Sequence, residues 1–193
     1  MKKLFTVFIA TLLLVGCTTQ VSEQGDTQMS NEADIVFETN KGTIEISLIN
    51  DSHTADNFEQ YVEDGFYDDT VIHRIVKEGI QVVQGGGFTE DLEQKETRSP
   101  ISLEDTGFKN VEGSLSMART RDPDSATSQF FINVEDNPAL DPEMQPPGYT
   151  VFGHVVSGLD VVKDIASIET ERRGQHINYP VEDVIVEDAY VKE

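Results

Sequence analysis

Residues 124–141 read DSATSQFFINVEDNPALD, in which a short apolar run begins with one amide and stops at another. Side chains of a strand alternate between the two faces of a sheet. One face of this predicted strand is therefore wholly apolar: Phe130, Ile132 and Val134. The other face mixes an aromatic ring with amides: Gln129, Phe131 and Asn133. A mixed face is expected either at the wall of a groove for a polar yet partly apolar ligand or where a loop half covers a sheet.

Seven further strand-like runs surround this stretch and are bounded by turn residues. They lie at residues 35–37, 43–48, 71–76, 80–84, 114–118, 150–156 and 184–191. Two predicted helices interrupt them: one over about residues 54–64, burying Phe58 and Val62, and one that starts at a capping box of Ser157 and Asp160. Closure leaves no exposed strand edge. The pattern therefore predicts a mainly β domain, a closed eight-stranded antiparallel barrel capped by two α-helices.

The first seventeen residues have the features of an export signal. Lys2 and Lys3 precede an apolar stretch, residues 4–15, that is too short to span a bilayer. The pattern resembles a bacterial lipoprotein signal, in which residues 1–16 are removed and the thiol of Cys17 receives the lipid. The alternative is an ordinary cleaved signal with an incidental cysteine.

The segment after the signal, residues 17–33, is polar and lacks apolar periodicity. We expect a flexible tether here, joining the lipid to one domain at residues 34–193. Thr18 rather than aspartate follows the cysteine, which favours the outer membrane, facing the periplasm. The expected location is thus the cell envelope, with membrane contact through the lipid anchor only.

The chain is strongly acidic, with 14 Lys and Arg against 36 Asp and Glu and a formal net charge of −22. Removing Lys2 and Lys3 with the signal leaves 12 basic residues against the same 36 acidic ones, a net charge of −24. Such a field repels nucleic acid and anionic lipid headgroups, so neither is an expected partner. The acidic residues are spread through the domain, which indicates a solvated surface. We expect a monomer.

Several kinds of catalytic chemistry find little support in the sequence. The histidines never occur at the spacing of metal ligands: His53, His73, His154 and His176. Asp122 and Asp124 begin a calcium-like loop that lacks its glycine and closing glutamate. Gly85-Gly86-Gly87 is followed by no Lys-Ser/Thr and no helix start, which favours a tight bend over a phosphate loop. No serine or cysteine has the surroundings of an activated nucleophile. We expect neither a metal nor another cofactor.

Arg74 stands inside an apolar run, VIHRIV at residues 71–76. A guanidinium in this position must pair with a carboxylate, extend to solvent or wait for a ligand. The surrounding stretch, DGFYDDTVIHRIVKEGIQVVQGGGFTED, resembles the cyclophilin family of peptidyl-prolyl cis–trans isomerases. The matching pieces run in the family's order: GFY at 65–67, HR at 73–74, QGG at 84–86, GSLSMA at 113–118, SQFFI at 128–132 and VFG at 151–153. The run MARTRDPDSATSQFFINV resembles the bacterial exported branch in particular.

The resemblance implies an enzyme that accelerates rotation about X-Pro bonds in folding envelope proteins, so that its partners would be unfolded or folding polypeptides. Arg74 would be catalytic by stabilising the twisted transition state, and His73 would point to the opposite face of the strand. The proline ring would be held by a first group of residues: Phe131, Met117 and Leu140, with Tyr149 as an aromatic wall. The peptide would be held by a second group: Gln84, Gln129 and the backbone of Ala118.

The chain departs from the family pattern in three places. Two extra residues stand between Arg74 and Gln84, which leaves open which neighbour lines the pocket: Ile80, Val82 or Val83. Tyr149 stands where many relatives carry histidine, and Ala139 where many carry an aromatic residue. A non-catalytic holdase or an envelope scaffold using the same groove stays open as an alternative, although a retained Arg74 argues against both.

Overall fold

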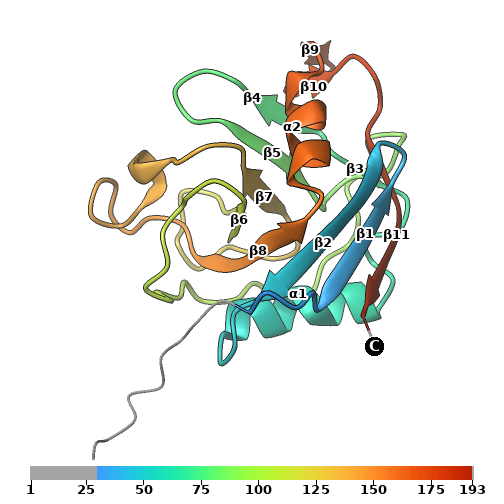
Figure 1. The fold of residues 1–193 in the computed structure, drawn as a ribbon. Coiled ribbons are helices and arrows are strands. Elements are labelled where there is room, and N and C mark those ends of the chain that lie inside the picture. The colour runs from blue at the N-terminus through green and yellow to red at the C-terminus, as the bar shows by residue number, and fades with distance from the viewer. Residues whose placement is uncertain (1–29, 193) are drawn as a thin grey trace, which may run out of the picture.

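The computed structural model describes residues 30–192, which form a strongly curled antiparallel sheet with two helices (Figure 1). The sheet has nine strands in the order β3-β11-β1-β2-β8-β6-β7-β5-β4. Their bounds are β1 (Ile35–Thr39), β2 (Gly42–Leu48), β3 (Thr70–Val71), β4 (Arg74–Val76), β5 (Val82–Gly85), β6 (Ser114–Met117), β7 (Phe130–Asn133), β8 (Val151–Ser157) and β11 (Ile185–Val191). Helix α1 (His53–Glu63) packs against β11 and β8, and α2 (Leu159–Ser167) packs against β2 and β5.

The sheet is curled but open, so the prediction of a closed eight-stranded barrel is wrong in strand number and in closure, whereas the mainly β class with two helices is confirmed. The hydrogen-bonded order ends at β3 on one side and β4 on the other. These two strands are the halves of the predicted strand at 71–76, which divides because its backbone changes partner. Ile72 N donates to Val184 O (2.9 Å), and His73 N donates to Gln84 O (3.1 Å).

The two helices begin in different ways. At α1 the hydroxyl of Ser52 accepts a hydrogen bond from Ala55 N (3.2 Å), and Phe58 and Val62 are buried as predicted. The capping box predicted for α2 is absent from the structure, because Ser157 ends β8 and Gly158 caps the helix with φ 83°. A Cβ at Gly158 would lie 2.2 Å from Thr43 O, so the close approach of β2 requires glycine here.

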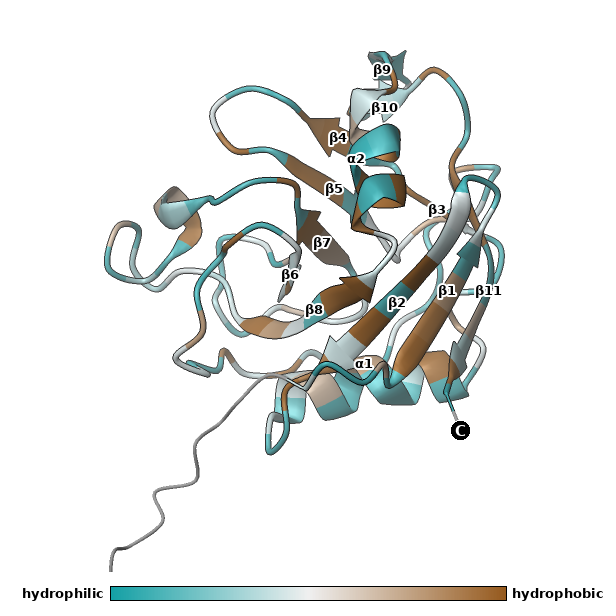
Figure 2. Ribbon diagram, viewed as in Figure 1, coloured by the Kyte–Doolittle hydropathy of each residue, from teal (hydrophilic) through white to brown (hydrophobic). Residues whose placement is uncertain are grey.

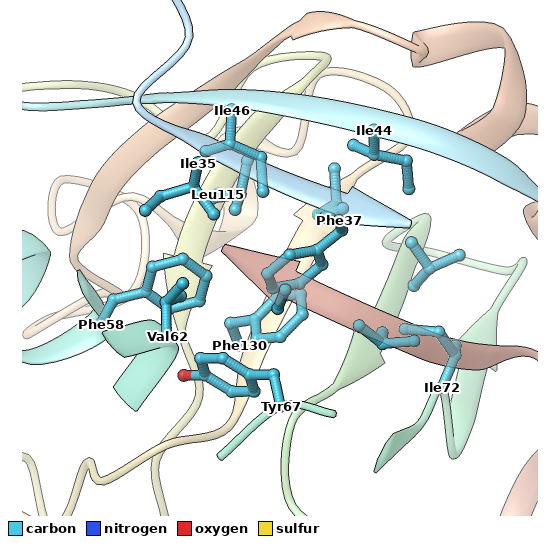
Figure 3. Close-up of a cluster of buried hydrophobic side chains, with 14 of the residues drawn as sticks. Ile35, Phe37, Ile44, Ile46, Phe58, Val62, Tyr67, Ile72, Leu115 and Phe130 are labelled. Atoms are coloured by element: carbon cyan, nitrogen blue, oxygen red, sulfur yellow. The ribbon is translucent and has the colours of Figure 1, made fainter. Parts of the chain in front are cut away.

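The core fills the inside of the curl with aromatic rings from several elements (Figure 3). Phe58 of α1 lies 4.8 Å from Phe152 and 5.0 Å from Tyr67 between ring centroids, and Phe37 lies 5.6 Å from Phe130. All five rings are at most 1% exposed. Each buried ring stabilises the fold by about 1.5–3 kcal/mol, which makes this packing a rigid support for the opposite face of the sheet. Figure 2 shows the apolar positions gathered along the strands.

A second, two-stranded sheet follows α2 and consists of β9 (Thr170–Arg173) and β10 (His176–Pro180). The sequence did not predict it, because TERRGQHINYP is mostly polar and shows no clean alternation. The Arg173 guanidinium lies 4.2 Å from the centroid of the Tyr179 ring and pairs with Asp183 at 2.6 Å. These contacts compensate for the small apolar area of the hairpin.

The predicted signal at 1–16, Cys17 and the tether as far as residue 29 lie outside the described residues, so the lipoprotein hypothesis stays a prediction. Within residues 30–192, no helix is both long and apolar enough to cross a membrane.

Candidate functional site

Three neighbouring strands bring the main predicted site residues into one row on the outer face of the sheet. Arg74 of β4 lies opposite Gln84 of β5, and Gln84 lies opposite Phe131 of β7. Directly opposed residues of antiparallel strands point to the same face. Their chain neighbours Ile75, Val83, Phe130 and Ile132 point the other way, into the core. The register of the strands therefore assembles the row.

A relay of hydrogen bonds links the polar members of this row. Arg74 Nη1 donates to Gln84 Oε1 (3.0 Å), and Gln84 Nε2 donates to Gln129 Oε1 (3.2 Å). A guanidinium can only donate, so it fixes the Gln84 oxygen toward Arg74 and the Gln84 amide group toward Gln129. Both amides are thus held in one orientation, and each keeps free hydrogen-bonding capacity for a ligand.

An apolar pocket opens beside this relay. Its lining consists of Arg74, Ile80, Val82, Gln84, Ala118, Arg119, Phe131, Leu140 and Tyr149. Phe131 is 5% exposed, and its ring meets the Tyr149 ring edge-on, with 5.6 Å between centroids. Leu140 comes from the 3₁₀ turn at Pro138–Leu140, and its carbonyl accepts from Tyr149 N (3.0 Å). We call this site the ring pocket.

Of the three residues left open by the insertion before Gln84, Ile80 and Val82 line the ring pocket. Val83 alternates to the other face and belongs to the main core. Met117, predicted to line the pocket, is placed elsewhere. It lies opposite Phe130 in the β6–β7 ladder, is 2% exposed and belongs to the main core. Because side chains alternate along a strand, Met117 points to the core face with Phe130 and not to the face that carries Phe131.

The three consecutive glycines, residues 85–87, lie against the chain segment that carries Gln129. A Cβ at Gly87 would lie 2.6 Å from Gln129 Cγ, and one at Gly86 would lie 2.9 Å from Ser128 O. Side chains here would displace Gln129 from the relay. The run is therefore required by close packing and a positive φ at Gly86 (80°), in agreement with the predicted bend.

Asn133, the amide that stops the apolar run of β7, is fully buried and is structural. Its Nδ2 donates to Ser114 Oγ (2.9 Å), and its Oδ1 accepts from Asn137 Nδ2 (2.8 Å). Asn137 in turn binds both backbone groups of Gln81 at 3.0 Å each. The network holds the start of β5 next to the turn that carries Leu140, which are two sides of the ring pocket. Of the two amides on the mixed face of this strand, Gln129 therefore lines the groove and Asn133 is buried beneath it.

Arg119 is the pocket residue that sequence reasoning missed. Its Nε and Nη2 donate to Gly148 O (3.2 and 2.6 Å), its Nη1 donates to Thr120 O (3.0 Å), and its guanidinium lies 4.5 Å from the centroid of the Tyr149 ring. It thereby holds the Gly148–Tyr149 segment at the pocket wall. The signal in the sequence was a second arginine directly after Ala118, within the matched run.

A second, polar pocket adjoins the ring pocket. It is lined by Gln84, Gln94, Thr97, Ala118, Arg119, Thr120, Ser125, Thr127 and Gln129. Gln84, Ala118 and Arg119 belong to both pockets and form the ridge between them. The two pockets together make a groove with one apolar and one polar compartment. An extended peptide in this groove would cross the relay of Arg74, Gln84 and Gln129.

His73, the chain neighbour of Arg74, is buried away from the groove. Its ring lies 4.8 Å from that of Phe88 and 5.8 Å from that of His176, and its Nδ1 has no hydrogen-bond partner within the described chain. Burial above all, with the nearby His176 and Arg74, lowers the pKa of His73 to about 4. A neutral ring behind the strand cannot exchange protons with a ligand in the groove.

Comparison with known proteins agrees with this geometry. The family model of the cyclophilin-type peptidyl-prolyl cis–trans isomerases matches residues 34–191. Peptidyl-prolyl cis-trans isomerase B of Escherichia coli is 46% identical over 165 residues, which cover 82% of this chain and 99% of the relative. A peptidyl-prolyl cis-trans isomerase of Acinetobacter baylyi is 44% identical over 161 residues, covering 82% of this chain and 85% of the relative.

Among solved structures, a cyclophilin-type peptidyl-prolyl cis-trans isomerase of Cryptosporidium parvum has the same fold, with a TM-score of 0.67 at 22% identity over 83% of this chain and 98% of that one. The chain therefore belongs to the cyclophilin-type peptidyl-prolyl cis–trans isomerases. It is accordingly an enzyme of the isomerase class.

Proposed function

We propose that the groove binds an X-Pro segment with the proline ring in the ring pocket and that Arg74 accelerates rotation about the X-Pro bond. One observation carries this proposal. Arg74 forms no ion pair within the described chain, is held by Gln84 at 3.0 Å, and lines the mouth of an apolar pocket based on Phe131. A guanidinium without a carboxylate partner, oriented by Gln84 beside apolar side chains, is the arrangement that this reaction needs.

The chemistry follows from the amide bond itself. Rotation faces a barrier of about 18–20 kcal/mol because the nitrogen lone pair is delocalised into the carbonyl. In the twisted transition state the lone pair is localised on the nitrogen and accepts a hydrogen bond. A guanidinium N–H beside that nitrogen stabilises the twisted form more than either planar isomer, which is the requirement for catalysis. The reaction consumes no nucleophile, metal or other cofactor.

The other residues of the groove bind and position the peptide. We assign the ring to the apolar side chains of the ring pocket: Phe131, Leu140, Tyr149, Ile80 and Val82. Gln84 and Gln129 hold the peptide backbone through the free capacity of their amides. Ala118 N already donates to Gln129 O (2.9 Å), so Ala118 would contribute its carbonyl rather than its N–H.

We propose further that the enzyme acts in the cell envelope as a lipid-anchored monomer. The pattern of residues 1–17 supports processing and lipidation at Cys17, and Thr18 favours the outer membrane, facing the periplasm. Its partners there would be unfolded or folding polypeptides with X-Pro bonds. The strong negative charge disfavours nucleic acid and anionic lipid headgroups as partners.

The test of this function is the rate of cis-to-trans conversion in a short X-Pro peptide, measured with the purified chain. We expect acceleration in proportion to enzyme concentration. A non-catalytic holdase or scaffold using the same groove would bind the peptide without changing that rate. Binding without acceleration would therefore contradict the proposal and support the alternative.

A further inference from the structure

The groove is a cationic site on a strongly acidic protein. Six of the twelve Lys and Arg residues in the described chain pair with carboxylates: Lys41, Arg98, Lys109, Lys163, Arg173 and Lys192. Arg74 and Arg119 line the groove, and neither pairs with a carboxylate of residues 30–192. In a chain with 36 acidic residues, two unneutralised guanidinium groups in one groove call for an explanation.

The lining of the groove preserves their charge. Among the described residues that line the two pockets, none is acidic. The nearest acidic residues along the chain, Asp122 and Asp124, follow Arg119 on the same loop but bind backbone instead. Asp122 Oδ1 accepts from Asp124 N (3.1 Å), and Asp124 Oδ1 accepts from Leu103 N (2.8 Å). The positive charge at the groove is thus left for a ligand to neutralise.

Arg119 is placed to act on the ligand. Its guanidinium has five N–H groups, of which three donate to the carbonyls of Gly148 and Thr120. The other two have no partner among the described residues, and Arg119 lines both the ring pocket and the polar pocket. Stacking on Tyr149 fixes the plane of the group without reducing its charge. A peptide that occupies both pockets passes directly over it.

We infer that Arg119 makes the enzyme selective for X-Pro segments with an acidic residue within two positions of the proline. This inference rests on the proposed function, because it concerns the substrate of the same groove. Arg74 would be occupied by the reacting nitrogen, whereas Arg119 lies beside the ring and can pair with a neighbouring carboxylate. Apart from Arg119, the residues that line the polar pocket are neutral, so charge selection depends on Arg119.

The expected size of the effect is modest, because Arg119 is only partly buried. A partly exposed ion pair favours one substrate over its neutral isostere by about three- to fivefold. The preference should fall as salt rises from about 0.05 to 1 M, because the Debye length shortens from above 10 Å to about 3 Å. It should appear chiefly in KM, since the carboxylate is bound equally in both planar isomers and the transition state.

The experiment compares peptides that carry Glu, Gln or Lys at each of the two positions before X-Pro and the two after it. Exchange NMR with the purified full chain measures cis–trans interconversion directly, so no coupling protease selects among the peptides. At one position or more, we expect kcat/KM to fall in the order Glu, Gln, Lys, and the preference to shrink at high salt. Arg119→Gln should abolish the order.

Two further variants separate charge selection from a structural role. Arg119→Lys keeps the charge but loses most of the bonding to Gly148, so it should retain the preference for Glu over Gln. Arg121→Gln removes an exposed cation two residues away that lines neither pocket, and it should leave the preference within twofold. If Arg119→Gln lowers kcat/KM by the same factor for all peptides, the ratio of kcat/KM for the Glu and Gln peptides stays unchanged. That result would show that Arg119 only supports the pocket wall and would overturn the inference.

The salt titration of the unmodified chain tests the inference without any variant. Acceleration of Glu, Gln and Lys peptides to the same extent at low salt would overturn the charge selectivity alone. Absence of acceleration for every peptide would overturn the proposed function, and the selectivity with it. The two failures are therefore distinguishable in one data set.

Discussion

Arg74→Ala is the perturbation that tests the proposed mechanism most directly. The variant removes the guanidinium that lies 3.0 Å from Gln84 Oε1 and leaves the strand and the ring pocket otherwise intact. Arg74 is only partly buried and belongs to neither hydrophobic cluster, so the fold should survive. The free energy of unfolding should change by less than about 1 kcal/mol, the scale of one hydrogen bond between partly exposed groups.

The magnitude of the catalytic loss follows from the number of donors involved. Arg74 is the one cation of the described relay, and removing one oriented donor to a transition state costs about 2.7–4 kcal/mol. At about 1.36 kcal/mol per tenfold change, that is a loss of about a hundred- to a thousandfold in kcat/KM. The loss should appear in kcat rather than KM, because the planar ground state has no localised lone pair for the guanidinium to bind.

The assay is exchange NMR on a short X-Pro peptide, with circular dichroism to confirm that each variant is folded. Lys77→Ala is a matched control, because Lys77 follows the same strand, is exposed and donates to Ser167 O rather than to the groove. It should retain kcat/KM within about twofold. Equal activity of Arg74→Ala and the unmodified chain, with matching spectra, would refute the mechanism.

Three further predictions concern support, titration and anchoring. Asn137→Ala leaves Gln81 N and Asn133 Oδ1 without their partner, so we expect a loss of about 2–3 kcal/mol in urea unfolding and a raised KM; an unchanged KM would contradict the supporting role. His73 has a folded pKa of about 4 against 6.5 unfolded, so stability should be lost as pH falls from about 6.5 to 4, by about 2–3 kcal/mol at pH 4.5. The same unfolding series in His73→Leu should lack that contribution, and an identical pH profile would exclude it. Cys17→Ser should leave the membrane pellet on cell fractionation, and full retention there would contradict the lipoprotein hypothesis.

The sequence predicted the two faces of strand β7 better than it predicted the closure of the sheet. Alternation along residues 129–134 places Phe130 and Phe131 on opposite faces without any knowledge of neighbouring strands, and the structure agrees. Whether the sheet closes into a barrel depends instead on the hydrogen-bonding partners of its two edge strands. The run at 71–76 is continuous in hydrophobicity, and only the separate pairing of Ile72 with Val184 and of His73 with Gln84 divides it. The pattern of side chains in the sequence does not indicate where a backbone changes its hydrogen-bonding partner.

The residues that were misplaced or missed share a different physical cause, namely cross-strand register. Met117 and Ala118 are equally plausible pocket residues in the sequence, and the pairing of Met117 with Phe130 decides that Met117 is core. Arg119 directly follows Ala118 in the sequence, but its position at the pocket wall depends on Gly148, which is 29 residues further along the chain. Periodicity reports the faces of one strand, whereas a site is made where several strands are in register.

The register of the strands places the apolar side chains of the site and its hydrogen-bond donor at different positions along the row. In the proposed function, the proline ring would contact side chains of β5, β7 and the turn at 138–140, and buried amides hold these elements next to one another. The twisted bond would receive its hydrogen bond from Arg74, which lies beside Gln84 in the same row and donates to it. Because Arg74 is positioned by a neutral amide rather than by a carboxylate, its charge is not neutralised before the substrate arrives. A carboxylate in place of Gln84 would hold Arg74 equally well but would compete with the transition state for its N–H groups, so the proposed mechanism favours an amide at this position.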